Sequence, residues 1–344
     1  MAPGAEELSA FEYVNVHGEV RHVAQLFCAC DDLDGMVDGL LKGSSARGDP
    51  DAFDRVLRDI DDRIRFVWPG GTGAKKLGLA GLLPPVCLPA AAWLAAQCWA
   101  SLALVLAALP ICLLLIYRRL KRLRQRNGFF LSWTLSSLAL CAAAYMLCFA
   151  DGLEPALNVF NVFLFVATII SLAHSVAPGA ELPASTDDAS HSRCHRCPVT
   201  GAMMLRYDHY CPWLDASVGF GNHRAYVCFV LLLNIMCLCA AASVGGLFGT
   251  VASPSRPVTQ RGASDEISFA AVYVSYLLLV AFATGLLLAD QAWLISHDRT
   301  TFERGRALEP ASGTRPLTFA LFLRNWREFA SGAYPTGAAS PTLE

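Results

Sequence analysis

Three residues with complementary chemistry fall within four positions of the chain: Asp208, His209 and Cys211. A cysteine thiol becomes an effective nucleophile when a neighbouring imidazole favours its thiolate. A carboxylate beside that imidazole can orient it and stabilise its charged form. The spacing therefore indicates thiol catalysis, with Cys211 as nucleophile, His209 as base and Asp208 as orienting group. Taken alone, the trio is equally compatible with a surface turn that contains a buried cysteine.

The elements that must position this trio are predicted to cross a membrane. The 344-residue chain is 54% hydrophobic and only 16% charged, whereas soluble domains contain about 25% charged residues. A helix needs about 20 apolar residues to cross a bilayer. Residues 77–117 carry no charge and suffice for two crossings, although Pro84, Pro85 and Pro89 predict an irregular first helix. Four further crossings are predicted at 129–150, 156–176, 225–251 and 267–289.

The basic residues predict the orientation of these spans. Lys75 and Lys76 precede the first pair and the basic run 118–126 follows it. Because such residues favour the cytosolic side, six spans with both termini in the cytosol are self-consistent, with a polar outer loop at 253–266. A five-span arrangement would leave one basic cluster on the wrong side. The acidic start of the chain does not resemble a cleavable signal peptide.

The predicted fold is an all-α polytopic membrane protein of about six helices, with a cytosolic, mostly irregular catalytic segment between helices four and five. In the N-terminal region, apolar periodicity predicts an amphipathic helix over 52–66. Residues 28–34 are interpreted as an acidic turn with two ordinary thiols rather than a metal site. We divide the chain into an N-terminal region (1–74), a first helix pair (77–117), a second helix pair (129–177), the catalytic segment (178–224), the last two helices (225–289) and a C-terminal region (290–344).

Several other function classes are disfavoured. The spans carry almost no ionisable side chains, whereas transporters and proton pumps place such groups at membrane depth. The basic run 118–126 is better explained as an anchor near anionic lipid than as a nucleic-acid site. Most cysteines lie within apolar runs, where a thiol acts as a small hydrophobic group. The remaining candidate is chemistry in the segment that contains Cys211.

The surroundings of the trio resemble the DHHC-type protein S-acyltransferases (palmitoyltransferases), in a variant with Tyr210 in place of the second histidine. The resemblance covers about 129–332 and follows the family order. Its motifs are Pro178-Gly179 (with Ala177 replacing the preceding Asp), Arg206-Tyr207, the core Asp208-His209-Tyr210-Cys211-Pro212-Trp213, then Val218-Gly219, Asn222, Arg224, Tyr226 and Phe229, a full TTxE at Thr300-Thr301-Phe302-Glu303, and Asn325-Trp326 with Phe329 and Gly332.

The resemblance implies a reaction. Cys211 would take a fatty acyl (palmitoyl) group from acyl-CoA and pass it to cytosolic cysteines of membrane-associated proteins, with His209 accepting the thiol proton. The compartment is left open between Golgi, ER and plasma membrane, and an inactive family member acting as a membrane scaffold is the alternative. The resemblance implies supporting roles for Pro212, Trp213, Asn222, Thr300, Thr301, Glu303 and Asn325. Four arginines are either contacts for CoA phosphates or ordinary juxtamembrane cations: Arg193, Arg206, Arg224 and Arg299.

The chain departs from the family at its zinc ligands. The family's cysteine-rich segment binds two zinc ions, each through three cysteines and one histidine. Cys197 falls on a ligand position, but Arg196, Thr200, Met203, Tyr210 and Ser217, together with positions 183 and 186, replace ligands. We therefore expect fewer than two zinc ions. A non-family site formed by His191, Cys194, His195 and Cys197 has the spacing of a zinc knuckle but no second arm to close it.

Overall fold

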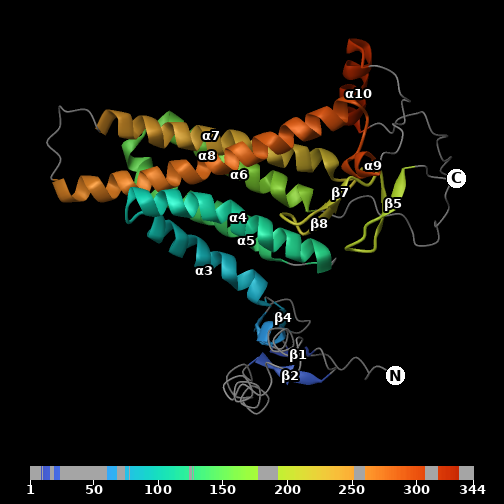
Figure 1. The fold of residues 1–344 in the computed structure, drawn as a ribbon, viewed down its shortest axis with the longest axis horizontal. Coiled ribbons are helices and arrows are strands. Elements are labelled where there is room, and N and C mark those ends of the chain that lie inside the picture. Colours follow the sequence, from blue (N-terminus) through green and yellow to red (C-terminus); the bar gives the residue numbers. More distant parts are fainter. Residues whose placement is uncertain are drawn as a thin grey trace. The chain divides into compact units, whose positions relative to one another are not determined.

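The computed structural model describes residues 9, 11–15, 19–23, 60–67, 74–76, 78–123, 126, 128–176, 193–251, 260–306 and 317–332. The chain divides into two compact units, Met1–Cys87 and Leu88–Glu344 (Figure 1). The predicted acidic turn at 28–34 lies outside the described residues.

The N-terminal unit contains two short antiparallel hairpins. Strand β1 (Glu12–Val14) pairs with β2 (Val20–His22), and β3 (Arg65–Phe66) pairs with β4 (Lys75–Lys76). The amphipathic helix predicted over 52–66 is wrong at its end, because only 60–63 are helical before the chain enters β3; residues 52–59 are not described. The physical reason is that Arg65 and Phe66 pair as a strand with Lys76 and Lys75, and in that position the Arg65 guanidinium lies 4.1 Å from the centre of the buried Tyr13 ring.

Six helices are long and apolar enough to cross a membrane among the residues that the structure describes. They confirm the predicted all-α polytopic fold. Their bounds are α3 (Gly78–Ala95), α4 (Trp99–Leu123), α5 (Phe129–Ala144), α6 (Pro155–Ser175), α7 (His223–Val251) and α8 (Gln260–Ser296).

Two details of these helices differ from expectation. Helix α3 continues through Pro84, Pro85 and Pro89 instead of being irregular. In an apolar medium the remaining backbone groups gain most by staying in the helical ladder, so prolines are tolerated there. Helix α8 extends past the predicted 267–289 at both ends, so the part of the expected outer loop from Gln260 onward is helical. Hydropathy marks the apolar window of a helix and not the point where its backbone hydrogen bonding stops.

Helices α5–α8 share one apolar core. Helix α7 packs against both α6 and α8, and α4 contributes Leu102 to a smaller cluster with Val272 of α8. Helix α5 continues into a π-helical turn (Tyr145–Phe149) and a 3-10 turn (Ala150–Gly152) before α6 begins. In Figure 1 helices α4–α8 lie side by side, and the strands of the catalytic segment gather with two short C-terminal helices at one end of the bundle.

The segment between α6 and α7 contains two short hairpins, which the expectation of mostly irregular structure missed. Strand β5 (Cys194–Arg196) pairs with β6 (Met203–Leu205), and β7 (His209–Cys211) pairs with β8 (Ala216–Val218). The short helices are α9 (Thr301–Gly305) and α10 (Phe319–Ser331). Cys211, Leu214 and Val218 from the second hairpin belong to the same apolar core as the membrane helices.

Candidate active site

Strand β7 places the predicted trio at the end of the helix bundle. Alternate residues of a strand share one face, so His209 and Cys211 point the same way while Tyr210 points to the other face. The Cys211 thiol lies beside the His209 imidazole and raises the pKa of that ring. On its other side, His209 Nδ1 donates to Asp208 Oδ2 at 2.6 Å. The three side chains therefore form a continuous line from carboxylate to imidazole to thiol.

The Asp208 carboxylate is buried and held by donors from distant parts of the chain. Its Oδ1 accepts from the Thr301 backbone N–H at 2.6 Å, and its Oδ2 accepts from the Thr301 hydroxyl at 3.1 Å. Gln291 Nε2 lies 3.4 Å from the same Oδ2. Burial alone raises the pKa of Asp208, but the facing His223 and the hydrogen bonds from His209 and Thr301 outweigh burial and hold that pKa well below its ordinary value. Asp208 is therefore a fixed negative charge.

The electrostatics of His209 follow from this charge. Burial disfavours the imidazolium, but hydrogen bonds to Asp208 and Cys211 and the charges of both partners raise the pKa of His209 to about 10. The Tyr226 ring packs edge-on against the imidazole, with the ring centres 5.3 Å apart. His209 can consequently accept and keep a proton from the neighbouring thiol.

Two buried residues that the sequence analysis missed extend this line behind Asp208. Gln291 of α8 accepts a 2.7 Å hydrogen bond from His223 Nε2 of α7 through its Oε1, which directs its Nε2 toward Asp208. The Phe329 ring packs edge-on against His223. A polar glutamine next to the apolar run of the last span was the available signal, since buried polar groups need partners.

The predicted TTxE motif forms a capped helix start. The Thr300 side chain accepts from Glu303 N at 3.2 Å, and the Glu303 carboxylate accepts from Thr300 N at 2.8 Å, which is a capping box. This cap fixes the orientation of α9, and with it the Thr301 N–H that reaches Asp208. Thr301 thus contacts the trio directly, and Thr300 and Glu303 support it by fixing the position of Thr301.

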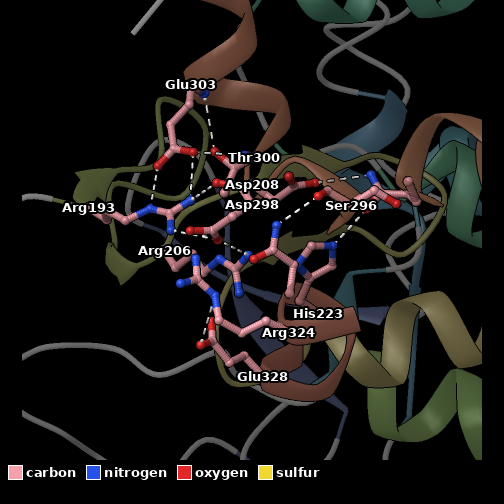
Figure 2. A network of polar contacts seen from close by, with 12 residues as sticks. Arg193, Arg206, Asp208, His223, Ser296, Asp298, Thr300, Glu303, Arg324 and Glu328 are labelled. Atoms are coloured by element: carbon pink, nitrogen blue, oxygen red, sulfur yellow. Dashed lines mark hydrogen bonds and ion pairs between the residues drawn. The ribbon is translucent and has the colours of Figure 1, made fainter. Parts of the chain in front are cut away.

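An ion-pair network anchors that cap to the two hairpins (Figure 2). Arg193 Nε and one terminal nitrogen donate to Glu303 at 2.6 and 2.7 Å, and the other terminal nitrogen donates to Asp298 at 3.0 Å. Arg206 donates to the same Asp298 oxygen at 2.9 Å. Both arginines are buried and face internal carboxylates, so the structure does not present them as CoA-phosphate contacts. Arg224 is exposed and donates to the Ala330 carbonyl at 3.4 Å, while Arg299 is half-buried.

The turn after Cys211 is fixed against α5. The Thr134 hydroxyl donates to the Trp213 carbonyl at 3.2 Å, and the Phe130 ring packs edge-on against the Trp213 indole at 4.6 Å. Arg126 donates to the Asp215 carbonyl at 2.8 Å. Pro212, half-buried, joins Cys211 to this anchored turn.

The two predicted supporting asparagines hold backbone rather than reacting groups. Asn222 donates to the Ser175 and Ser217 carbonyls, both at 3.0 Å, and accepts from Gly219 N at 2.9 Å. It therefore ties the end of α6 to β8 and to the start of α7. Asn325 donates to the Ser296 carbonyl at 2.7 Å, which attaches α10 to the end of α8.

The weak metal candidates do not converge in the part of the chain that the structure describes. His195 stacks on Phe302 with ring centres 4.3 Å apart, and Cys194 lies on the adjacent, opposite-facing position of β5. Cys197 is buried, and His191 lies outside the described residues. Within those limits, no three His, Cys, Asp or Glu side chains lie close enough together to hold a metal ion.

The positions that carry zinc ligands in the resembling family do not fit zinc here. A structural zinc site needs four thiolate or imidazole ligands. In the family, positions 197, 200, 210 and 217 hold one zinc ion, and of the residues at these positions only Cys197 can supply a thiolate or imidazole ligand. Of the other ligand set, Arg196 donates to the Gly201 carbonyl at 2.9 Å and Met203 is the strand partner of Arg196.

Comparisons with known proteins agree with the residue-level resemblance. A family model described as DHHC palmitoyltransferase matches residues 185–307. Palmitoyltransferase ZDHHC23 of Rattus norvegicus is 26% identical, over 96% of this chain and 94% of the rat protein. ZDHHC23 of Homo sapiens is also 26% identical, over 92% and 93% of the two chains. Palmitoyltransferase ZDHHC2 of Homo sapiens is 30% identical over 40% of this chain and 36% of that protein. Similarity to ZDHHC23 thus extends into the N-terminal region, which the motifs did not cover.

Proposed function

Because the chain belongs to the DHHC palmitoyltransferase family, we propose that it is a protein S-palmitoyltransferase that carries the acyl group on Cys211. The observation that supports this assignment best is the line Asp208–His209–Cys211. Its carboxylate is buried, receives hydrogen bonds from three residues, and lies 2.6 Å from the imidazole that neighbours the thiol.

In the first half-reaction, His209 takes the proton of Cys211, and the thiolate attacks the thioester carbonyl of acyl-CoA. The bond between the carbonyl carbon and the CoA sulfur breaks, and CoA leaves with the proton held by His209. The fixed charge of Asp208 stabilises the imidazolium during this exchange. The products are free CoA and an acyl-Cys211 thioester.

In the second half-reaction, a cysteine of a protein substrate gives its proton to His209 and attacks the acyl-Cys211 carbonyl. The bond to the Cys211 sulfur breaks, and that sulfur regains a proton from His209. The supporting residues do not react. Thr300, Thr301 and Glu303 fix Asp208. Asn222, Pro212 and Trp213 fix the backbone next to β7, and Asn325 holds α10 to the end of α8. No step consumes an oxidant or reductant, and the thioester bond is conserved in each exchange.

The surroundings of Cys211 favour a lipid acyl group. Cys211 is part of the apolar core that α5–α8 share. Burial of each acyl CH2 in such an environment contributes about 0.8 kcal/mol. A long chain attached to Cys211 is therefore best accommodated between the helices, with its thioester at the end of the bundle where the strands gather (Figure 1).

The proposed orientation puts this end of the bundle, the segment 178–224 and both termini in the cytosol. It is supported by the basic run at 118–126, by Lys75 and Lys76, and by the even number of spans. The substrates would accordingly be cytosolic cysteines of membrane-associated proteins. We propose that the chain is organised as an N-terminal region, two helix pairs, the catalytic segment 178–224, a last helix pair and a C-terminal region.

The test is acylation of the purified full chain with labelled palmitoyl-CoA. We expect stoichiometric release of CoA and a hydroxylamine-sensitive label on the enzyme, both absent in Cys211→Ser. Cys194→Ser is the matched control, because this thiol lies in the same segment but outside the trio, and it should retain the label. Label on Cys211→Ser would refute the nucleophile, and an unlabelled wild-type chain would favour the scaffold alternative, which the intact trio otherwise disfavours.

A further inference from the structure

Four side chains from the two hairpins lie near one another on the face of β7 opposite to Cys211. Tyr210 and Ser217 are direct partners across β7 and β8, so their side chains share a face. Thr200, in the turn between β5 and β6, has its hydroxyl 3.1 Å from the Ser217 hydroxyl. The Ser217 hydroxyl lies near the Cys197 thiol and lowers its pKa, and the Tyr210 ring packs against the cluster that contains Cys197. These are four positions at which the family places the ligands of one zinc ion.

Here hydrogen bonds join three of the four positions, Cys197, Thr200 and Ser217, and Tyr207 takes part in place of Tyr210. The Cys197 sulfur accepts from the backbone N–H groups of Val199 and Thr200 at 3.4 and 3.5 Å, and from the Tyr207 hydroxyl at 3.7 Å. The Tyr210 hydroxyl turns away and donates to Asp215. Neutral hydroxyls are poor zinc ligands beside a single thiol, because zinc sites use thiolates, imidazoles and carboxylates.

We propose that the hydrogen-bonded cluster of Cys197, Thr200, Tyr207 and Ser217 links the two hairpins in place of a structural zinc ion, and that these positions keep the geometry of the metal site. Two consequences follow. The wild-type hairpins hold together without metal at this point, and ligands restored at positions 200, 210 and 217 should complete a site with Cys197. The inference concerns the scaffold of β7 and stands whether or not Cys211 transfers acyl groups.

The principal experiment restores the ligands in the full chain. The triple variant should bind about one zinc ion per chain more than wild type, measured by elemental analysis after gel filtration. It combines Thr200→Cys, Tyr210→His and Ser217→Cys. With Co²⁺ in place of zinc, the triple variant should show thiolate-to-metal absorption. Adding Cys197→Ser should abolish the extra metal, whereas adding Cys194→Ser should leave it. A folded triple variant that gains no metal would overturn the inference.

A second experiment does not depend on the triple variant folding. Thr200→Val with Ser217→Ala removes the hydroxyl pair while leaving the Cys197 thiol in place. We expect its thermal midpoint to fall by about 2–4 °C, and a zinc chelator to change neither its midpoint nor that of wild type. An unchanged midpoint, or wild-type zinc that Cys197→Ser removes, would contradict a hydrogen-bonded link. Both readouts are metal content and stability, so neither depends on palmitoyl transfer.

Discussion

Replacing Asp208 by Asn tests the geometry of the trio most directly. The variant keeps the shape of the side chain but replaces one acceptor oxygen with an NH2 donor. In the wild type, both oxygens accept: Oδ1 from Thr301 N, and Oδ2 from His209 Nδ1 and from the Thr301 hydroxyl. Whichever way the new amide turns, one N–H must face another donor. The backbone N–H of Thr301 can only donate, whereas His209 Nδ1 can also accept, so the favoured orientation is the one in which the amide NH2 faces His209.

That orientation reverses the tautomer of His209. Its Nδ1 would accept from the amide, so Nε2 would carry the proton and could no longer take one from Cys211. The corresponding change in a carboxylate–imidazole–hydroxyl arrangement costs about 10⁴-fold in rate. A thiol ionises more readily than a hydroxyl and depends less on its base. We therefore expect the acylation rate of Asp208→Asn to fall by about 10²–10³-fold, or roughly 3–4 kcal/mol of transition-state stabilisation.

The assay is single-turnover acylation with saturating palmitoyl-CoA, followed by the release of CoA. Asp290→Asn is the matched control, because Asp290 forms an exposed ion pair with Arg304 and is not a hydrogen-bond partner of Asp208. An exposed pair contributes less than about 1 kcal/mol, so this control should acylate at nearly the wild-type rate. If Asp208→Asn acylated within threefold of wild type, the orienting role of the carboxylate would be refuted.

Three further outcomes follow from the same contacts. Gln291→Leu deprives His223 Nε2 of its acceptor and Asp208 of one donor, so we expect roughly tenfold slower acylation; an unchanged rate would mean that these two residues only pack. Glu303→Gln breaks the buried pair with Arg193 and should destabilise the chain by about 3–5 kcal/mol in chemical denaturation, while Arg304→Met, in an exposed pair, should change little. Because the pKa of His209 is raised from 6.5 to about 10, its stabilising contribution is complete below pH 6.5 and is lost as the pH rises through 10. The thermal midpoint of wild type should therefore fall more between pH 7 and 10 than that of His209→Gln, and parallel curves would contradict the assigned shift.

The sequence predicted the features that depend on local pattern. Runs of about 20 apolar residues gave the spans because a bilayer imposes that length whatever the partners are. The order Asp208, His209, Cys211 predicted a thiol site because these groups fall within four positions of the chain, on strand β7 and immediately before it. The TTxE capping box was also readable, since a cap forms between residues three apart.

The missing features depend on contacts between distant segments. Gln291 and Asp208 meet across α8 and β7, and nothing in either local sequence specifies that pairing. Arg193 and Arg206 looked like available cations, but Asp298 and Glu303 neutralise them about a hundred residues further along. The two hairpins were missed because each strand is only three residues long, too short for alternation to be recognised.

The pattern of matches and departures from the family has a physical explanation in these contacts. Thr301 touches the Asp208 carboxylate directly, and Thr300 with Glu303 fixes Thr301, so a change at any of them alters the electrostatics of His209. The residues at the zinc positions make contacts outside the trio: Thr200 meets Ser217, Cys197 meets Tyr207, and Tyr210 meets Asp215. They are connected to Cys211 through β7, β8 and the turn between these strands. A group of side chains that supports the strand without touching the reacting atoms can be exchanged together, from metal ligands to hydrogen-bonding residues, while the line from Asp208 to Cys211 stays unchanged.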